Sequence, residues 1–361
     1  MIEKYYNGVI EQVAGGIGNV EHNSILVRYS NDFSIWDLES VNHYKDQTDI
    51  FFTCHEFSYN KIAEAYEPYL GLIRQMFHKY CSGTLEEFME ECDVYKLQRP
   101  VFESYFEKGF CERTEQILID EVEYEQERIR NSIVTMLQKL SEIRPVVIVL
   151  NRFQLASKST MQLSNSLLQV KNKNIGIVLG VNDVQSIPEF AHEEWDAICE
   201  SMDDRNMVYH IGNAGRNMEP DVMDYYSDYE SDDGYRKLNN LVYFLDFDQA
   251  DHHLSKIERR IKFDNFTISE KKHYQLLLLQ IMVSVLQRDI AKALESCEDL
   301  EKLQDQEKEG AFYYNFWMAT SYMYLGKLEE AMIYVQKAKE CGEALGDDFL
   351  VFRAELLKAQ N

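Results

Sequence analysis

The chain has 361 residues, of which 45% are hydrophobic and 27% are charged. This is the composition of a globular protein, so a wholly disordered chain is excluded, and the length favours two domains. The 37 Lys and Arg residues stand against 62 Asp and Glu residues, a formal net charge of −25. Such a surface repels phosphate backbones and anionic lipid, so we expect neither nucleic-acid binding nor membrane binding through this region.

The seven cysteines are scattered and form no CxxC pair. An odd, dispersed set argues against a disulfide framework or a zinc site and favours a reducing compartment. No apolar run approaches the roughly 20 residues that a membrane helix needs, and the first residues lack the pattern of a signal peptide. The sequence therefore predicts a cytoplasmic protein without a metal site.

Residues 1–213 show strand-like runs alternating with helical segments, which predicts an α/β domain. The runs are apolar at consecutive positions, as in strands of a parallel sheet that are buried on both faces. Strands are expected over 25–29, 50–54, 146–150, 175–179 and 208–211. Helices are expected over about 56–80, 117–141, 157–170 and 189–203, with another that begins at a capping box formed by Thr84 and Glu87. A glycine cluster at 15–18 precedes the first strand and indicates the end of a helix and a turn.

An acidic segment follows the last predicted strand. Between Arg216 and Arg236 there are seven acidic residues and no basic one. Mutual repulsion and the lack of aliphatic anchors predict an exposed linker or mobile loop over 214–235. A docking site for a basic partner is the alternative.

From residue 236 to residue 361 the apolar period is helical, and a motif recurs. Small residues at Ala250, Ala293 and Ala331 are each followed by apolar residues four and seven positions later, and they lie 43 and then 38 residues apart. This spacing fits a helix, a turn and a second helix in each unit.

The third unit resembles a tetratricopeptide repeat at Tyr322, Leu325-Gly326, Ala331 and Ala338. In that family the glycine permits the turn between the two helices, and the small alanine lets them approach closely. Leu245 and Arg288 replace the turn glycine in the first two units, so helical hairpins of no named family are the alternative. The resemblance implies a surface for a protein partner.

The last apolar stretch reads as the first helix of a further repeat. The array is therefore expected to be incomplete within this sequence, with an apolar face carrying Leu350 and Leu356 left uncovered. A homodimer through the C-terminal helices would cover that face.

The strand at 146–150, followed by a short loop and a helix beginning near Ser159, resembles the Walker B region of the STAND class of signalling ATPases. The next strand runs into Asn182-Asp183, where that class has its sensor position. The resemblance implies a parallel-sheet, P-loop-NTPase-like domain followed by helical repeats.

The residues at the positions that bind phosphate and Mg²⁺ in that class differ in this chain. Phosphate binding needs a glycine-rich loop and a lysine, yet the first strand is followed by Ser30, Asn31, Asp32 and Ser34. Where the paired acids should stand, the chain has Asn151 and Arg152, which offer Mg²⁺ no carboxylate. The six positions named here mark a degenerate site, so we expect no catalytic residue, cofactor or metal.

Another candidate, Cys54-His55, ends the second predicted strand. Adjacent residues on a strand point to opposite faces, which disfavours a thiolate–imidazole pair. A catalytic role is therefore not expected of these two residues.

These features predict a non-catalytic regulatory and protein-interaction module of a larger bacterial signalling protein. Its partner would be another protein or its own output domain. Residues 98–107 and 121–125 resemble regions that precede GGDEF diguanylate cyclase domains, and LuxR-type regulators share the order of parts. A nucleotide- or small-molecule-operated switch that uses the remnant cleft is the alternative.

Overall fold

The protein is described by a computed structural model that covers two compact units. The first comprises Met1–Asp228 and Tyr243–Asp246, and the second comprises Tyr229–Val242 and Phe247–Asn361. The structure describes residues 2–19, 23–30, 34–45, 47, 49–58, 61–111, 122–170, 172–183, 187–203, 207–211, 231–263 and 266–359.

Within these ranges the first unit is built on a five-stranded parallel sheet with strand order β2-β3-β4-β1-β5. Strands β3 and β4 are buried along their whole length, as the consecutive apolar residues predict. The predicted α/β class with a parallel sheet is confirmed. The strands are β1 (Ser24–Tyr29), β2 (Phe51–Glu56), β3 (Val146–Asn151), β4 (Ile175–Asn182) and β5 (Val208–Ile211).

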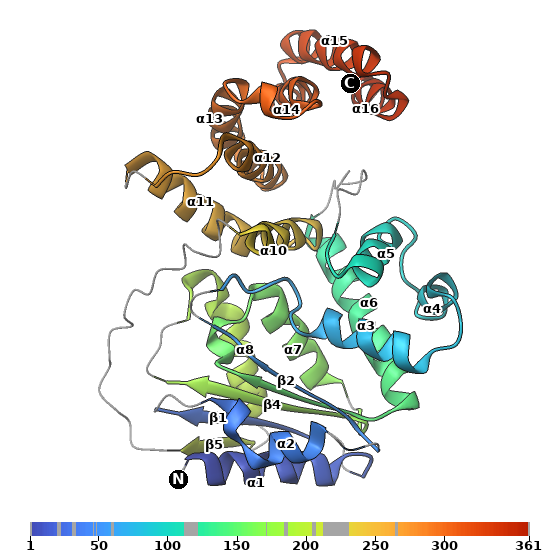
Figure 1. Cartoon of the computed structure of the whole chain (residues 1–361), viewed down its shortest axis with the longest axis vertical. Helices are drawn as coiled ribbons and strands as arrows, with labels where there is room; N and C mark the ends of the chain where they lie inside the picture. Colours follow the sequence, from blue (N-terminus) through green and yellow to red (C-terminus); the bar gives the residue numbers. More distant parts are fainter. Residues whose placement is uncertain are drawn as a thin grey trace. The chain divides into compact units, whose positions relative to one another are not determined.

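Helices cover both faces of this sheet (Figure 1). Helices α1 (Ile2–Gly16) and α2 (Glu39–Lys45) lie on one face, and α3, α6, α7 and α8 lie on the other. The remaining bounds are α3 (Tyr69–Tyr80), α4 (Leu85–Glu91), α5 (Arg99–Lys108), α6 (Val122–Ile143), α7 (Lys158–Gln169) and α8 (His192–Asp203), with short 3-10 turns η1 (Ile35–Asp37), η2 (Phe153–Leu155) and η3 (Glu189–Ala191).

The local signals have mixed outcomes. The capping box of Thr84 and Glu87 is formed, and α1 ends at Gly16 before Gly18 adopts a φ of 82°. The helix predicted over 56–80 is wrong in its first half, because α3 begins only at Tyr69, after Pro68. Proline cannot donate a helical backbone hydrogen bond, so a helix does not run through it at low cost. The apolar pattern does not predict α1, α2 or α5.

The second unit consists of helices packed in chain order. From α11 to α16 each helix contacts the next, and α14 also contacts α12 and α16. A helical region follows the sheet, as predicted, but α10 begins at Asp232, inside the predicted linker. Residues 214–230 of that linker lie outside the described residues. The bounds are α10 (Asp232–Tyr243), α11 (Phe247–Phe263), α12 (Glu270–Leu286), α13 (Ile290–Glu301), η4 (Gln304–Gln306), α14 (Gly310–Tyr324), α15 (Leu328–Leu345) and α16 (Asp348–Ala359).

The turns between α10 and α11, α12 and α13, and α14 and α15 share one backbone feature. Leu245, Arg288 and Gly326 have φ values of 64°, 63° and 71°, in the left-handed region. Five residues after each of them stands the buried alanine of its hairpin, with 0% of its surface exposed. The buried alanine therefore follows the same turn in all three cases, although only one turn contains glycine. The two helices on either side of the turn pack closely in α12–α13 and in α14–α15. These alanines are Ala250, Ala293 and Ala331.

We expect Arg288→Gly to stabilise the second unit by about 0.5–1 kcal/mol. Arg288 is exposed, and a side chain in the left-handed region carries a steric cost that glycine avoids. Urea unfolding would measure the change, with Gly326→Ala as the matched opposite, expected to destabilise by a similar amount. Loss of stability in Arg288→Gly would show that the arginine side chain stabilises this turn.

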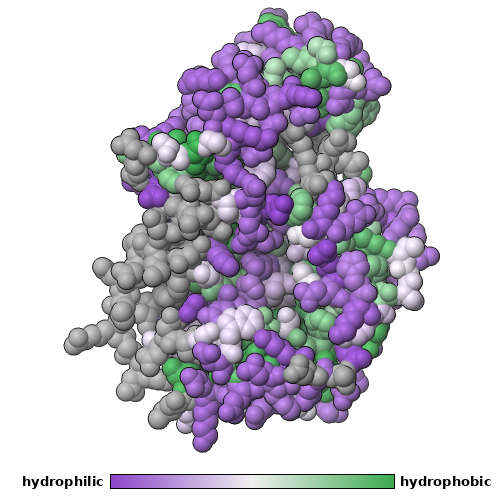
Figure 2. Space-filling view, in the orientation of Figure 1, coloured by the Kyte–Doolittle hydropathy of each residue, from purple (hydrophilic) through white to green (hydrophobic). Residues whose placement is uncertain are grey.

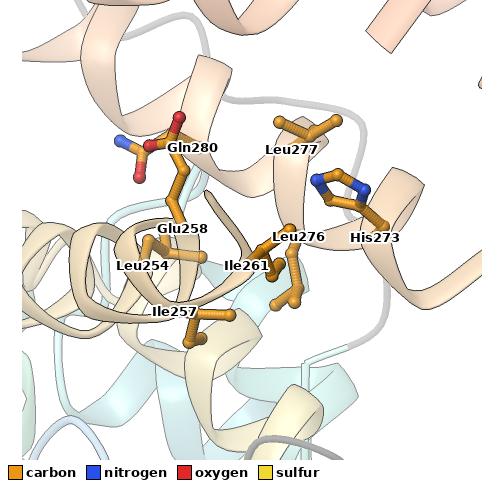
Figure 3. Close-up of a pocket in the computed structure, with 8 residues that line it drawn as sticks. All are labelled: Leu254, Ile257, Glu258, Ile261, His273, Leu276, Leu277 and Gln280. Carbon is orange, nitrogen blue, oxygen red and sulfur yellow. The ribbon is translucent and has the colours of Figure 1, made fainter. Parts of the chain in front are cut away.

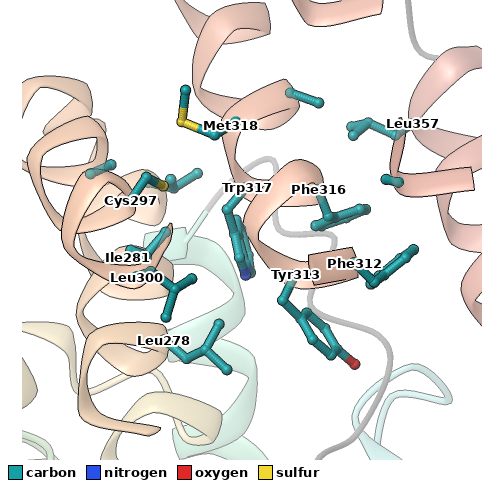
Figure 4. Packing of buried hydrophobic residues seen from close by; sticks show 14 of the residues in the cluster. Leu278, Ile281, Cys297, Leu300, Phe312, Tyr313, Phe316, Trp317, Met318 and Leu357 are labelled. Atoms are coloured by element: carbon teal, nitrogen blue, oxygen red, sulfur yellow. The ribbon is translucent and has the colours of Figure 1, made fainter. Parts of the chain in front are cut away.

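The core of the second unit is aromatic (Figure 4). Phe312, Phe316 and Trp317 of α14 pack in one cluster that also contains Leu350 and Leu357 of α16. Leu350 is only 3% exposed, so the expected uncovered face of the last helix is wrong at this position. The homodimer through the C-terminal helices stays a prediction, and it cannot depend on Leu350 as an outward-facing contact.

The face of the molecule seen in Figure 2 is mainly hydrophilic, with apolar residues in small separate patches. Among the described helices, none combines the length and the apolar character needed to cross a membrane. All seven cysteines fall within the described ranges and are free thiols.

Candidate functional site at the carboxyl edge of the sheet

The strand order places a topological switch point at the carboxyl ends of β1 and β4. The chain leaves β1 for β2 at one edge of the sheet, whereas it leaves β4 for β5 at the other edge. Ligands of open parallel sheets bind in the crevice at such a point. Four of the positions singled out in the sequence lie here: Ser30 and Ser34 follow β1, and Asn151 and Arg152 end and follow β3.

A buried hydrogen bond links the ends of β1 and β3 across β4. The hydroxyl of Tyr29 donates to Oδ1 of Asn151 at 2.7 Å, and both residues are at most 1% exposed. Gly180 of β4 lies between them, and a Cβ atom there would overlap the hydroxyl of Tyr6. Burial, reinforced by neighbouring Tyr29 and Glu56, raises the pKa of Tyr6 well above its usual value. Neutral polar side chains therefore occupy this part of the edge.

A carboxylate at the end of β2 contacts the residue after β3 and the start of η1, which follows β1 in the chain. Glu56, the last residue of β2, lies with Oε1 at 3.1 Å from the guanidinium of Arg152. Its Oε2 accepts hydrogen bonds from the backbone N–H of Ile35 at 3.1 Å and from the hydroxyl of Ser34 at 3.3 Å. The side chains of Glu56 and Arg152 are 10% and 18% exposed. We call Ser34, Ile35, Glu56 and Arg152 the edge cluster.

Arg152 adopts an unusual backbone conformation in this cluster. Its φ of 53° and ψ of 41° place it in the left-handed region, directly before the turn η2. Few residues other than glycine adopt this conformation unless their surroundings stabilise it. The ion pair with Glu56 is one such stabilising contact, since it fixes the side chain over the end of β2.

The residues at the end of β4 are also bonded to neighbouring segments. The backbone N–H of Asn182 donates to Oε1 of buried Gln154 at 3.2 Å. Asp183 pairs with Arg28 at 2.8 Å, and its backbone N–H donates to the carbonyl of Tyr29. These contacts tie the end of β4 to β1 and to η2.

The predicted site residues have three outcomes. Asn31 and Asp32 lie outside the described residues. Ser30 stands partly buried at the end of β1, and Ser34, Asn151 and Arg152 take part in the contacts above. Sequence reasoning missed Glu56, although an acidic residue two positions after the predicted strand 50–54 is a signal that could have found it.

The aromatic side chain of Trp36, in η1, does not fill this edge. Trp36 is 46% exposed, and the ammonium of Lys45 lies 4.4 Å from the centre of its ring. The edge cluster and the Tyr29–Asn151 hydrogen bond provide the polar contacts there instead.

Cys54 and His55 lie in different environments, as strand geometry predicts. Cys54 packs with the core under α1 and α2, whereas Nε2 of His55 lies 3.5 Å from a carboxylate oxygen of Glu67. Burial raises the pKa of Cys54 to about 11 despite the nearby charge of Lys45, which disfavours a reactive thiolate. Across the described residues, no group of three or more His, Cys, Asp or Glu side chains is arranged to hold a metal ion.

Comparison of the chain with protein-family models gives no match, and comparison with curated proteins gives none either. The fold therefore defines the class: a parallel-sheet α/β unit and a unit of packed helical hairpins.

Proposed function

We propose that the protein is a non-catalytic regulatory and protein-interaction module, in which a degenerate STAND-like α/β domain accompanies tetratricopeptide-like hairpins. The observation that carries this proposal is the ion pair of Glu56 and Arg152 at 3.1 Å. It lies at the sheet edge where the resemblance places nucleotide chemistry.

The edge cluster is unsuited to holding Mg²⁺ and a nucleotide. A guanidinium after β3 repels a divalent cation, where carboxylates would bind one. The Glu56 carboxylate takes the hydroxyl of Ser34 and the N–H of Ile35, donors that an oxyanion would otherwise use. It would also repel a phosphate placed beside it.

The helical unit supports the interaction part of the proposal. Its hairpins repeat one turn and one buried alanine, the arrangement of a solenoid that exposes side chains from successive units. Large side chains with apolar surface are partly exposed along it, and tyrosines such as Tyr324 are enriched at the centres of protein interfaces. The partly exposed side chains include Tyr324, Leu325, Leu328, Ile333 and Phe352, which are 45–57% exposed. In this proposal the module passes a partner's signal to an output domain, as the resemblance implies.

Calorimetric titration with ATP and Mg²⁺ tests the catalytic part. We expect no binding in the low-micromolar range, because the groups that normally supply phosphate and metal contacts are replaced or already bonded. Arg152→Met serves as the matched variant. If ATP binding were seen and this substitution abolished it, the nucleotide would bind at the carboxyl edge of the sheet. Low-micromolar binding that depends on Arg152 would favour a nucleotide-operated switch instead.

A further inference from the structure

A pocket lies between α11 and α12 in the helical unit (Figure 3). It holds about 260 Å³ of empty space, part of it open to solvent. Five aliphatic side chains form its walls, and polar groups stand at its ends. Figure 3 shows the Glu258 carboxylate and the Gln280 amide at one end and the His273 ring at the other. The aliphatic residues are Leu254, Ile257, Ile261, Leu276 and Leu277.

Gln280 supplies a buried hydrogen-bond acceptor to this pocket. The residue is 3% exposed, and its Nε2 donates to Oδ1 of Asp251 at 3.0 Å and to the hydroxyl of Ser284 at 3.2 Å. A carboxylate only accepts, so the amide nitrogen must face Asp251. Oε1 is then left without a partner among the described residues. A buried acceptor in this state favours a ligand that brings a donor.

The polar end of the pocket is also negatively charged. Glu258 pairs with Lys262 at 2.7 Å, but the same ammonium lies 3.0 Å from Glu295 and 4.0 Å from Asp299. Lys302 pairs with Asp299 at 2.7 Å. Three carboxylates thus share two ammonium groups, which leaves an excess of negative charge beside the pocket. Burial lowers the pKa of His273, so its ring adds no positive charge near neutral pH.

We propose that this pocket binds a lysine side chain of a protein partner. Its four-carbon stem matches the aliphatic walls, and its ammonium can donate both to Oε1 of Gln280 and to the carboxylate of Glu258. The excess negative charge beside the pocket and the net charge of −25 favour a basic partner segment. This inference rests on the proposed function, because it assigns a partner chemistry to the helical unit.

The test is a nuclear magnetic resonance titration of the full chain that follows the Gln280 side-chain amide and the Ile257 methyl groups. The probes are n-butylammonium, neutral n-butanol, a tripeptide with a central lysine and the same tripeptide with norleucine. We expect saturable shifts with the ammonium and the lysine peptide, the peptide binding more tightly. The neutral probes should bind at least about tenfold more weakly, as a lost charge-assisted hydrogen bond implies.

Two variants separate the pocket from its surroundings. Glu258→Gln and Gln280→Met should each weaken lysine-peptide binding about tenfold and leave norleucine-peptide binding unchanged. Glu295→Gln is the control, because Glu295 shares Lys262 but does not line the pocket. Equal loss in Glu258→Gln and Glu295→Gln, equal binding of charged and neutral probes, or binding of the amine but not of the peptide would each overturn the lysine assignment. ATP binding in the calorimetric test would instead count against the proposed function and leave this pocket unaffected.

Discussion

Gly180→Ala is expected to destabilise the first unit by about 3 kcal/mol, because the added methyl group has no room. A Cβ atom at this position would overlap the hydroxyl of Tyr6 and lie 2.7 Å from Oδ1 of Asn151. Neither side chain can withdraw easily, since both are 0% exposed and Asn151 is bonded to Tyr29. The strand would have to shift, which would disturb the switch point itself.

The matched control is Gly8→Ala in α1. Gly8 is exposed, and none of the described atoms lies within 4 Å of the Cβ that alanine would add. An alanine in a helix interior is favoured over glycine by roughly 0.5–1 kcal/mol, so this variant should be slightly more stable. Urea unfolding followed by far-ultraviolet circular dichroism measures both. Similar stability of the two variants would mean that β4 adjusts and that the crowding at Gly180 is unimportant.

The strands of the sheet could be predicted because burial on both faces leaves a pattern within each short stretch of sequence. Strands buried on both faces must be apolar at consecutive positions, and the runs around Val149 and Val178 meet that condition. The partners at the carboxyl edge could not be predicted in the same way. Glu56 and Arg152 are 96 positions apart in the sequence, and only the pairing of β2 with β3 brings them together. A single sequence identifies the ends of strands but not their order in a sheet.

At the turns of the helical region the sequence differs from the expected pattern, but the backbone does not. Arg288 and Leu245 adopt the left-handed turn that glycine favours, at a steric cost of about 1 kcal/mol each. In the α12–α13 hairpin, burial of the following alanine and the contacts between the two helices offset that cost. A residue other than glycine at these two turns therefore affects the local energy and not the left-handed backbone of the turn. Leu350 could not be placed correctly because its burial depends on other helices of the same cluster, chiefly α15.

Arg152→Asp is expected to destabilise the first unit by about 3 kcal/mol and to confer no ATP hydrolysis. The substitution restores an acid where the STAND resemblance has one, but it places that acid opposite Glu56 in a mostly buried position. Removing one partner of such a pair leaves an uncompensated charge, and a second carboxylate adds repulsion. The left-handed backbone is not the cause, because aspartate and asparagine adopt it more readily than most residues.

Arg152→Asn isolates the charge effect, since it keeps the compatible backbone and removes only the positive group. We expect it to lie between the wild type and Arg152→Asp in urea unfolding. Adding Glu56→Gln to Arg152→Asp should recover about 1–2 kcal/mol, because the amide can donate to the new carboxylate and the repulsion is gone. A stable Arg152→Asp variant, or one that hydrolyses ATP in a phosphate-release assay, would show that this edge retains the chemistry of an ATPase and that Arg152 only blocks it.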